Sequence, residues 1–221
     1  MPSWLTLPDR CPASLTLIAI TVACYLAQIS TQGAVTELGM LYGPLVQHGQ
    51  WWRLLSAGFM HGGLLHVAFN MYLLYVLGPQ LERWLGSVRF ILIYFGAMLG
   101  GSLAVMIFDW GQATLGASGA ALGLAGAMGV ALHAKGVSPR QSPVMGLVVL
   151  NLALPLLVPG ISFWGHFGGI LSGALMGYLL IWQPTRSKNV SLQTSLVSGI
   201  ATLVVFALAA FMFGRMGGLS I

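Results

Sequence analysis

Seven apolar segments of 15 to 22 residues run through this 221-residue chain and restrict what it can fold into. About 20 apolar residues in a helix cross the hydrocarbon core of a bilayer. Only 6% of the residues are charged, whereas a soluble domain carries roughly 25%. We therefore expect an all-α polytopic membrane protein whose helices are residues 13–29, 63–81, 90–108, 116–133, 144–158, 164–182 and 192–213.

The connections between these segments suggest how the chain is organised. The connection at 31–62 is long and rich in aromatic residues, which favours a position in the membrane interface. A signal peptide is the alternative for the first segment, but no small-x-small cleavage site follows it. The expected parts are a cytosolic lead-in at 1–12, a six-helix core at 13–182, a linker at 183–191, a seventh helix at 192–213 and an external tail at 214–221.

The basic residues predict the orientation, because cytosolic loops carry an excess of lysine and arginine. With the N-terminus inside, seven basic residues fall on the cytosolic side and two on the outer side. An odd number of spans then places the C-terminus outside, and the compact chain suits a plasma (inner) membrane. The inner residues are Arg10, Arg83, Arg89, Lys135, Arg140, Arg186 and Lys188, and the outer ones are Arg53 and Arg215.

Four polar residues are expected at one depth of the bundle. The second, fourth and sixth segments all run from outside to inside, so their first turns share the outer leaflet. These turns carry His66 and Asn70, then Ser118, then His166. Polar groups within a membrane tend to face the bundle interior or a water-filled cavity. We expect one site, open to the outer side.

Serine and histidine at one depth predict nucleophilic chemistry. Serine attacks only when a base takes its proton, and His166 could act as that base for Ser118. Asp9 and Glu82 are expected in the cytosol, and Glu37 and Asp109 in outer loops. Because no carboxylate is placed to orient the histidine, we expect a Ser-His dyad and not a triad.

Small residues would let the two helices approach closely. Gly169 and Gly173 share the helix face of His166, and Ala121, Ala125 and Gly129 share that of Ser118. The alternative is an ordinary glycine packing motif in which Ser118 bonds a neighbouring helix.

An oxyanion formed at Ser118 would need hydrogen-bond donors. The backbone N–H of Ser118 at the helix start is one candidate. His66 and Asn70, four residues apart on one helix face, are two more, although both could instead be packing polars.

Other ligand classes are disfavoured. A net charge of +5 does not indicate a nucleic-acid partner, because the basic residues are scattered singly. His61, His66 and His166 invite a metal interpretation, but no zinc-protease pattern or carboxylate accompanies them. We expect no metal and no cofactor, and the sequence does not specify an oligomeric state.

Residues 51–182 resemble the rhomboid family of intramembrane serine proteases. The resemblance rests on Trp52-Arg53, His61, His66-Val67-Ala68-Phe69-Asn70, Glu82-Arg83, Gly116-Ala117-Ser118-Gly119 and Gly165-His166-Phe167-Gly168-Gly169, in this order. One difference is Leu122, where the family often has an aromatic residue that stacks on the histidine. The segment at 192–213 resembles the extra C-terminal helix of a rhomboid subset.

The resemblance implies six helices around a water-filled cavity that opens outward. It implies that Ser118 and His166 cleave peptide bonds in or near transmembrane helices of other proteins, without a cofactor. The oxyanion hole would comprise the Ser118 N–H, His66 and Asn70, and Trp52-Arg53 would help to hold the first loop. Two alternatives are a catalytically inactive protein that binds membrane clients, and a small transporter. Both proposed catalytic residues are present and no inverted repeat is evident, which disfavours each.

Overall fold

The computed structural model describes residues 11–158, 160–186 and 191–217. Most of the lead-in expected at 1–12, part of the linker at 183–191 and the end of the tail at 214–221 lie outside the described residues. The long helices are α1 (Pro12–Ser30), α5 (Leu64–Leu85), α6 (Ser87–Phe108), α7 (Ser118–Ala134), α8 (Pro143–Leu157), α9 (Phe163–Gly177) and α11 (Leu192–Met216).

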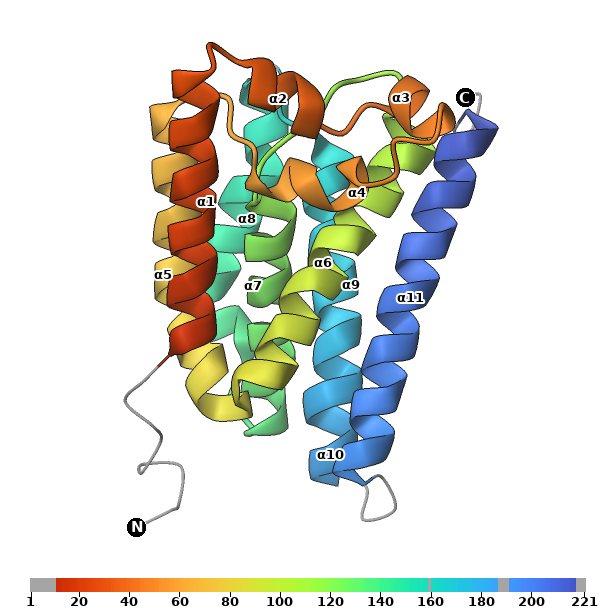
Figure 1. Cartoon of the computed structure of the whole chain (residues 1–221). Helices are drawn as coiled ribbons and strands as arrows, with labels where there is room; N and C mark the ends of the chain where they lie inside the picture. The colour runs from red at the N-terminus through yellow and green to blue at the C-terminus, as the bar shows by residue number, and fades with distance from the viewer. Residues whose placement is uncertain (1–10, 159, 187–190, 218–221) are drawn as a thin grey trace.

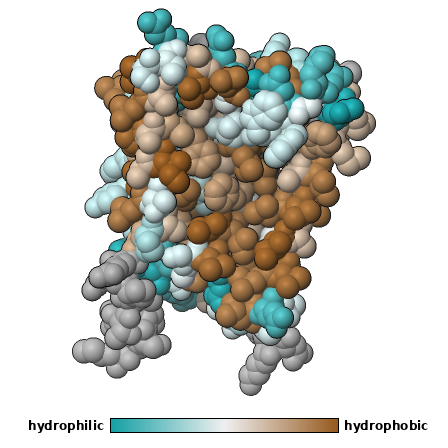
Figure 2. Space-filling model, viewed as in Figure 1, coloured by the Kyte–Doolittle hydropathy of each residue, from teal (hydrophilic) through white to brown (hydrophobic). Residues whose placement is uncertain are grey.

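These helices form one upright bundle in which α1 starts at one end and α11 finishes at the other (Figure 1). Five helices or continuous helical stretches of the described chain are long and apolar enough to cross a membrane, and α7 and α8 are shorter apolar helices. Figure 2 shows hydrophobic residues over the middle of one face and hydrophilic residues concentrated toward its two ends. The all-α polytopic membrane fold is therefore confirmed, including two short helices at the expected positions.

Glycine sets the distance between α7 and α9. A Cβ added to Gly169 would overlap Gly119, and one added to Gly173 would overlap the carbonyl of Gly123. The two backbones are therefore in direct contact along this stripe.

The expected contact face of α7 was wrong by one or two residues. Ala121, Ala125 and Gly129 do not form the stripe against α9; Gly119, Gly123 and Ala127 do. The backbones of α7 and α9 approach each other most closely at the glycines of α7. Ser118 precedes the first of these glycines and therefore lies at the edge of the contact.

Glu82 joins three helices at the end of the bundle where α1 begins. Its carboxylate accepts hydrogen bonds from the N–H groups of Ala13 and Ser14 and from the hydroxyls of Ser14 and Ser87. These donors satisfy the carboxylate although Glu82 is buried. This explains why α5 continues four residues beyond the expected end at 81 and stops only at Gly86 (φ +80°).

The long connection between α1 and α5 folds into short helices across the upper end of the bundle (Figure 1). They are α2 (Ala34–Gly39), α3 (Gly43–Gln47), α4 (Arg53–Ser56) and η2 (Ala57–Phe59). The buried Arg53 guanidinium donates to the carbonyls of Glu37 and Met40, each at 2.7 Å. Trp52 donates its indole N–H to the carbonyl of Leu38. Both residues thus connect separate parts of the loop through hydrogen bonds.

The helical stretch that includes α9 continues past the end expected at residue 182. A π-helical turn, η4 (Tyr178–Trp182), leads into α10 (Gln183–Arg186). In a π-helical pattern the N–H of residue 184 would bind the carbonyl of Leu179, but proline has none. That carbonyl instead accepts the hydroxyl of Ser195 at 2.9 Å. The proline therefore leaves an acceptor that ties α11 to the core.

Candidate active site

Ser118 is the first residue of α7, after a turn that depends on glycine. Gly116 has φ +127°, a conformation that L side chains rarely adopt. A Cβ on Gly116 would also lie 2.8 Å from Nε2 of His66 and 3.7 Å from Oγ of Ser118. Gly116 therefore lets the imidazole of His66 approach the backbone segment that leads into Ser118.

His166 lies in the first turn of α9, and a hydrogen-bonded cap fixes where that helix starts. The hydroxyl of Ser162 accepts the N–H of Gly165 at 3.0 Å and donates to the carboxylate of Asp109. Asp109 thus anchors the start of α9 without touching the imidazole.

Ser118 and His166 are hydrogen-bonded. Nε2 of His166 lies 3.0 Å from Oγ of Ser118, and its Nδ1 lies 2.9 Å from the carbonyl oxygen of Asn151 on α8. A carbonyl can only accept, so Nδ1 carries a proton and the neutral ring's Nε2 is the acceptor for the serine hydroxyl. The tautomer is the one a general base requires.

The carbonyl of Asn151 is available because of Pro155. In an α-helix the carbonyl of residue 151 would accept the N–H of residue 155, but proline has no N–H. Asn151 is the only buried residue of α8, a helix that the structure describes in full. Leu122 is fully buried but has no aromatic ring that could stack on His166. The hydrogen bond to the carbonyl of Asn151 therefore helps to orient the imidazole instead.

His66 presents a hydrogen-bond donor toward Gly116. Its Nδ1 accepts the N–H of Gly62 at 3.3 Å, so the neutral ring carries its proton on Nε2, the atom that faces Gly116. Asn70 lies one turn further along α5 and is buried, and its amide donates to the carbonyl of His66 at 2.9 Å. The structure therefore brings His66 to the edge of the site, with Asn70 behind it.

His61 supports the site from the loop. Its Nε2 accepts the N–H of Ala117 at 3.3 Å, directly before Ser118, and its ring packs edge-on against His66 with centroids 5.0 Å apart. Burial, and then the nearby His66, lower the pKa of His61 to about 4, against a smaller opposing effect of the Phe59 backbone. His61 is therefore neutral at physiological pH, as its acceptor role requires.

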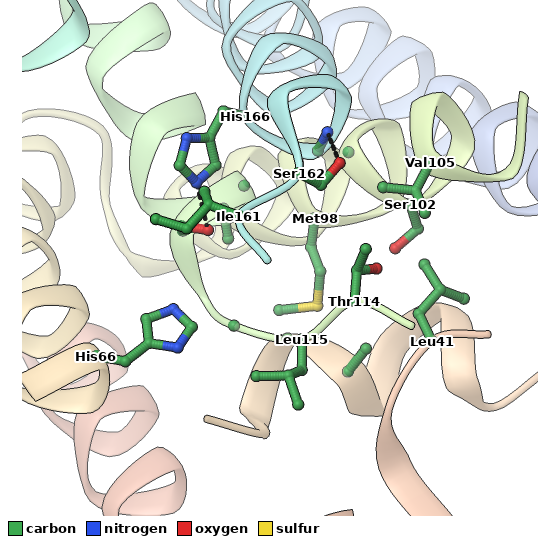
Figure 3. Close-up of a pocket in the computed structure, with 18 of the residues that line it drawn as sticks. Leu41, His66, Met98, Ser102, Val105, Thr114, Leu115, Ile161, Ser162 and His166 are labelled. Carbon is green, nitrogen blue, oxygen red and sulfur yellow. Dashed lines mark hydrogen bonds between the residues drawn. The ribbon is translucent and has the colours of Figure 1, made fainter. Parts of the chain in front are cut away.

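His66 and His166 border a cavity of about 80 Å³. In Figure 3, His66 and His166 lie at one end of the cavity, and Leu41, Ser102 and Val105 lie at the other. Ser118, Gly119 and Ile161 also line it, whereas Asn70 does not. Since the N–H of Ser118 has no hydrogen-bond partner in the described part of the chain, it is free for a bound group.

Sequence reasoning placed Ser118, His66 and His166 together but missed three contributors. The acceptor role of His61, the cap formed by Ser162 and Asp109, and the Asn151 carbonyl were not foreseen. A serine three residues before Gly165 was a signal for the cap.

Comparisons with known proteins point to one family. A family model described as Rhomboid domain matches residues 48–183. The chain is 33% identical over 160 residues to RHOMBOID-like protein 6, mitochondrial, of Arabidopsis thaliana, covering 70% of this chain and 52% of that protein. It is 35% identical over 156 residues to Rhomboid protease GluP of Bacillus subtilis, covering 67% of this chain and 31% of that protein. The aligned part is thus about half or less of these two relatives.

Proposed function

This chain belongs to the rhomboid family, and on that premise we propose that it is an intramembrane serine endopeptidase with a Ser118–His166 dyad. The observation that carries the proposal is the 3.0 Å contact between Nε2 of His166 and Oγ of Ser118, with Nδ1 held by the carbonyl of Asn151. The acceptor nitrogen faces the hydroxyl, which is the arrangement that activates a serine.

In the proposed reaction, Nε2 of His166 takes the proton of Ser118 while Oγ attacks the carbonyl carbon of a peptide bond. The imidazolium then donates this proton to the leaving amine, and water hydrolyses the acyl-enzyme by the reverse proton path. The carbonyl of Asn151 keeps accepting from Nδ1–H throughout, and this bond strengthens when the ring is charged. A backbone carbonyl thus does part of the work of a triad's acid.

The oxyanion would be bound by donors already placed around Ser118. The free N–H of Ser118 and Nε2–H of His66 border the space above Gly116. Asn70 acts through His66, because its amide holds the carbonyl of that residue and does not line the cavity. Such preformed donors commonly supply 10²- to 10³-fold in rate each.

The proposed substrates are transmembrane segments of other membrane proteins. The cavity next to Ser118 is small and bordered by Gly101, Gly116 and Gly119, which supports a small side chain at the cleaved bond. The substrate would reach it from the lipid phase in which the bundle lies.

The test is the substitution Ser118→Ala, with a model transmembrane substrate reconstituted in liposomes. We expect cleavage to fall about 10⁴-fold or more, because the nucleophile is lost. The matched control is Ser102→Ala, which removes a hydroxyl of the same cavity that donates to the carbonyl of Leu54. Cleavage by folded Ser118→Ala near the wild-type rate would exclude the dyad.

A fluorophosphonate probe separates chemistry from substrate access. We expect it to label the wild type but not His166→Ala, and cleavage gels of the same samples report proteolysis. Labelling that persists without His166 would require another base. A wild type that is folded but neither labelled nor proteolytic would be the inactive client-binding alternative.

We also propose that the site opens to the outer side of a plasma (inner) membrane, with the N-terminus in the cytosol and the C-terminus outside. The supporting observation is that Arg83, Arg89 and Lys135 lie at helix ends remote from the site. In a Cys11→Ser, Cys24→Ser background, a membrane-impermeant maleimide should label exposed His48→Cys in intact cells and Val137→Cys only after permeabilisation. The reverse pattern would invert the orientation.

A further inference from the structure

A second cavity lies at the end of the bundle opposite Ser118. It has a volume of about 210 Å³ and lies between the end of α5, the start of α6, the end of α7 and the helical stretch that follows α9. Its polar lining consists of Trp84, Arg89, Lys135 and Thr185. Nothing in the proposed proteolysis uses this cavity.

The lining is positively charged and rich in hydrogen-bond donors. Arg89 is half-buried, and its guanidinium has no hydrogen bond or ion pair within the described residues. The ammonium of Lys135 lies 3.3 Å from the ring centroid of Trp84, which keeps the charge at the cavity wall. Partial burial lowers the pKa of Lys135 from its ordinary value near 10.5.

Among the residues that the structure describes, no carboxylate lines this cavity. Glu82, on the last turns of α5, is turned toward α1 and Ser87 and is fully engaged there. An arginine fork and an ammonium that share a cavity without a carboxylate match the oxygens of a phosphate group.

The remaining walls suggest that this phosphate belongs to a lipid. Leu85 and Ile181 form apolar parts of the lining, and Val88 beside Arg89 is 63% exposed on the outside of the bundle. The cavity thus lies where the spanning helices end, at the depth of lipid headgroups. We propose that this cavity binds the phosphate of an anionic lipid headgroup, with Arg89 and Lys135 as its ligands.

Binding is tested by native mass spectrometry of the full chain in detergent, with phosphatidylglycerol as the probe. Each basic residue near a membrane surface is worth roughly fivefold in affinity for anionic lipid. We therefore expect Arg89→Gln and Lys135→Gln each to weaken binding about fivefold, and the double variant about 25-fold. The control Arg140→Gln removes the same charge from an exposed position outside the cavity and should change affinity less than twofold.

Two further probes distinguish the sources of phosphate. Phosphatidylcholine should bind at least tenfold more weakly than phosphatidylglycerol, and inorganic phosphate should compete only at far higher concentration. Any of three results would overturn the proposal. The two lipids could bind equally well, equimolar phosphate could displace the lipid, or the double variant could keep full affinity.

A measurement on the wild type avoids any folding defect of the variants. Phosphatidylglycerol with a photoreactive group near its glycerol should cross-link to peptides that contain Trp84 to Arg89 or Ala131 to Lys135. Cross-links confined to the outward face of α11 would contradict the site.

Discussion

The α7–α9 interface and helix α8 differ in how they are packed, although both contribute to the environment of His166. Along α7 and α9, glycines bring the two backbones into contact, and Ser118 and His166 head this interface. In α8, Asn151 is the only buried residue reported, and Val149, Leu150, Leu156 and Leu157 are exposed. Ser118 and His166 are thus held by close backbone packing, while the second hydrogen-bond partner of His166 lies on a loosely packed helix.

Some contacts around His166 can therefore be lost without separating α7 from α9. Displacing α8 would break the bond from Nδ1 of His166 to Asn151 but leave the α7–α9 contact intact. Regions with few buried contacts open most easily. The comparison predicts that changes at the glycine interface affect folding, whereas changes in α8 affect the activation of Ser118.

The largest effect is expected for Gly173→Ala. Its new methyl group would overlap the carbonyl of Gly123, so the two helices must separate. We expect a loss of at least about 3 kcal/mol in the free energy of unfolding, measured by reversible unfolding in micelles, and loss of activity.

The matched control is Gly146→Ala in α8, where an added methyl group meets no atom within 4 Å. A helical glycine replaced by alanine at a free position gains up to about 1 kcal/mol. If both variants were equally stable, the proposed contrast between the interface and α8 would be wrong.

The glycine contact between α7 and α9 was only partly predictable from the sequence. Hydropathy was sufficient to predict the helices. The shared direction of the fourth and sixth apolar segments was sufficient to predict that Ser118 and His166 lie at the same end of the bundle. The contact face of α7 was predicted wrongly because Ser118 was assumed to lie at its centre. The end of α5 at Leu85 and the helical continuation past residue 182 involve contacts with other helices, through Ser14 and Ser195, which a local pattern does not show.

The orientation of His166 shows a different limit. Its partner is a backbone carbonyl, which every residue has, so the identity of Asn151 carries no signal. The proline four residues later does predict a free carbonyl in α8. Only the packing of α8 against α9 decides which donor uses it.

An intermediate effect on stability is expected when the pH is lowered. It acts at the hydrogen bond between His61 of the loop and the backbone of Ala117. His61 has a pKa of about 4 in the folded protein, against about 6.5 for a free histidine. Between these values the unfolded chain binds more protons, so this contribution to stability is complete above pH 6.5 and is lost as the pH falls toward 4. Across that window it amounts to about 3 kcal/mol.

His61→Gln keeps a side-chain acceptor for the N–H of Ala117 but does not titrate in this range. We expect unfolding free energies of wild type and variant to converge between pH 7 and pH 4.5, because only the wild type loses the His61 contribution. Parallel pH profiles of the two proteins would show that His61 is not the group responsible.

The smallest effect, and the most specific, is expected for Pro155→Ala. The alanine supplies an N–H that competes with His166 for the carbonyl of Asn151. A hydrogen bond of this kind contributes about 1 kcal/mol, so fluorophosphonate labelling of Ser118 should slow five- to tenfold. Stability should not fall, since the helix gains a backbone bond.

The control Pro79→Ala removes the internal proline of α5, which is remote from the imidazole of His166, and this variant should be labelled at the wild-type rate. Equal slowing in both variants would point to straightened helices, and unchanged labelling in Pro155→Ala would mean that the α7–α9 interface alone orients His166.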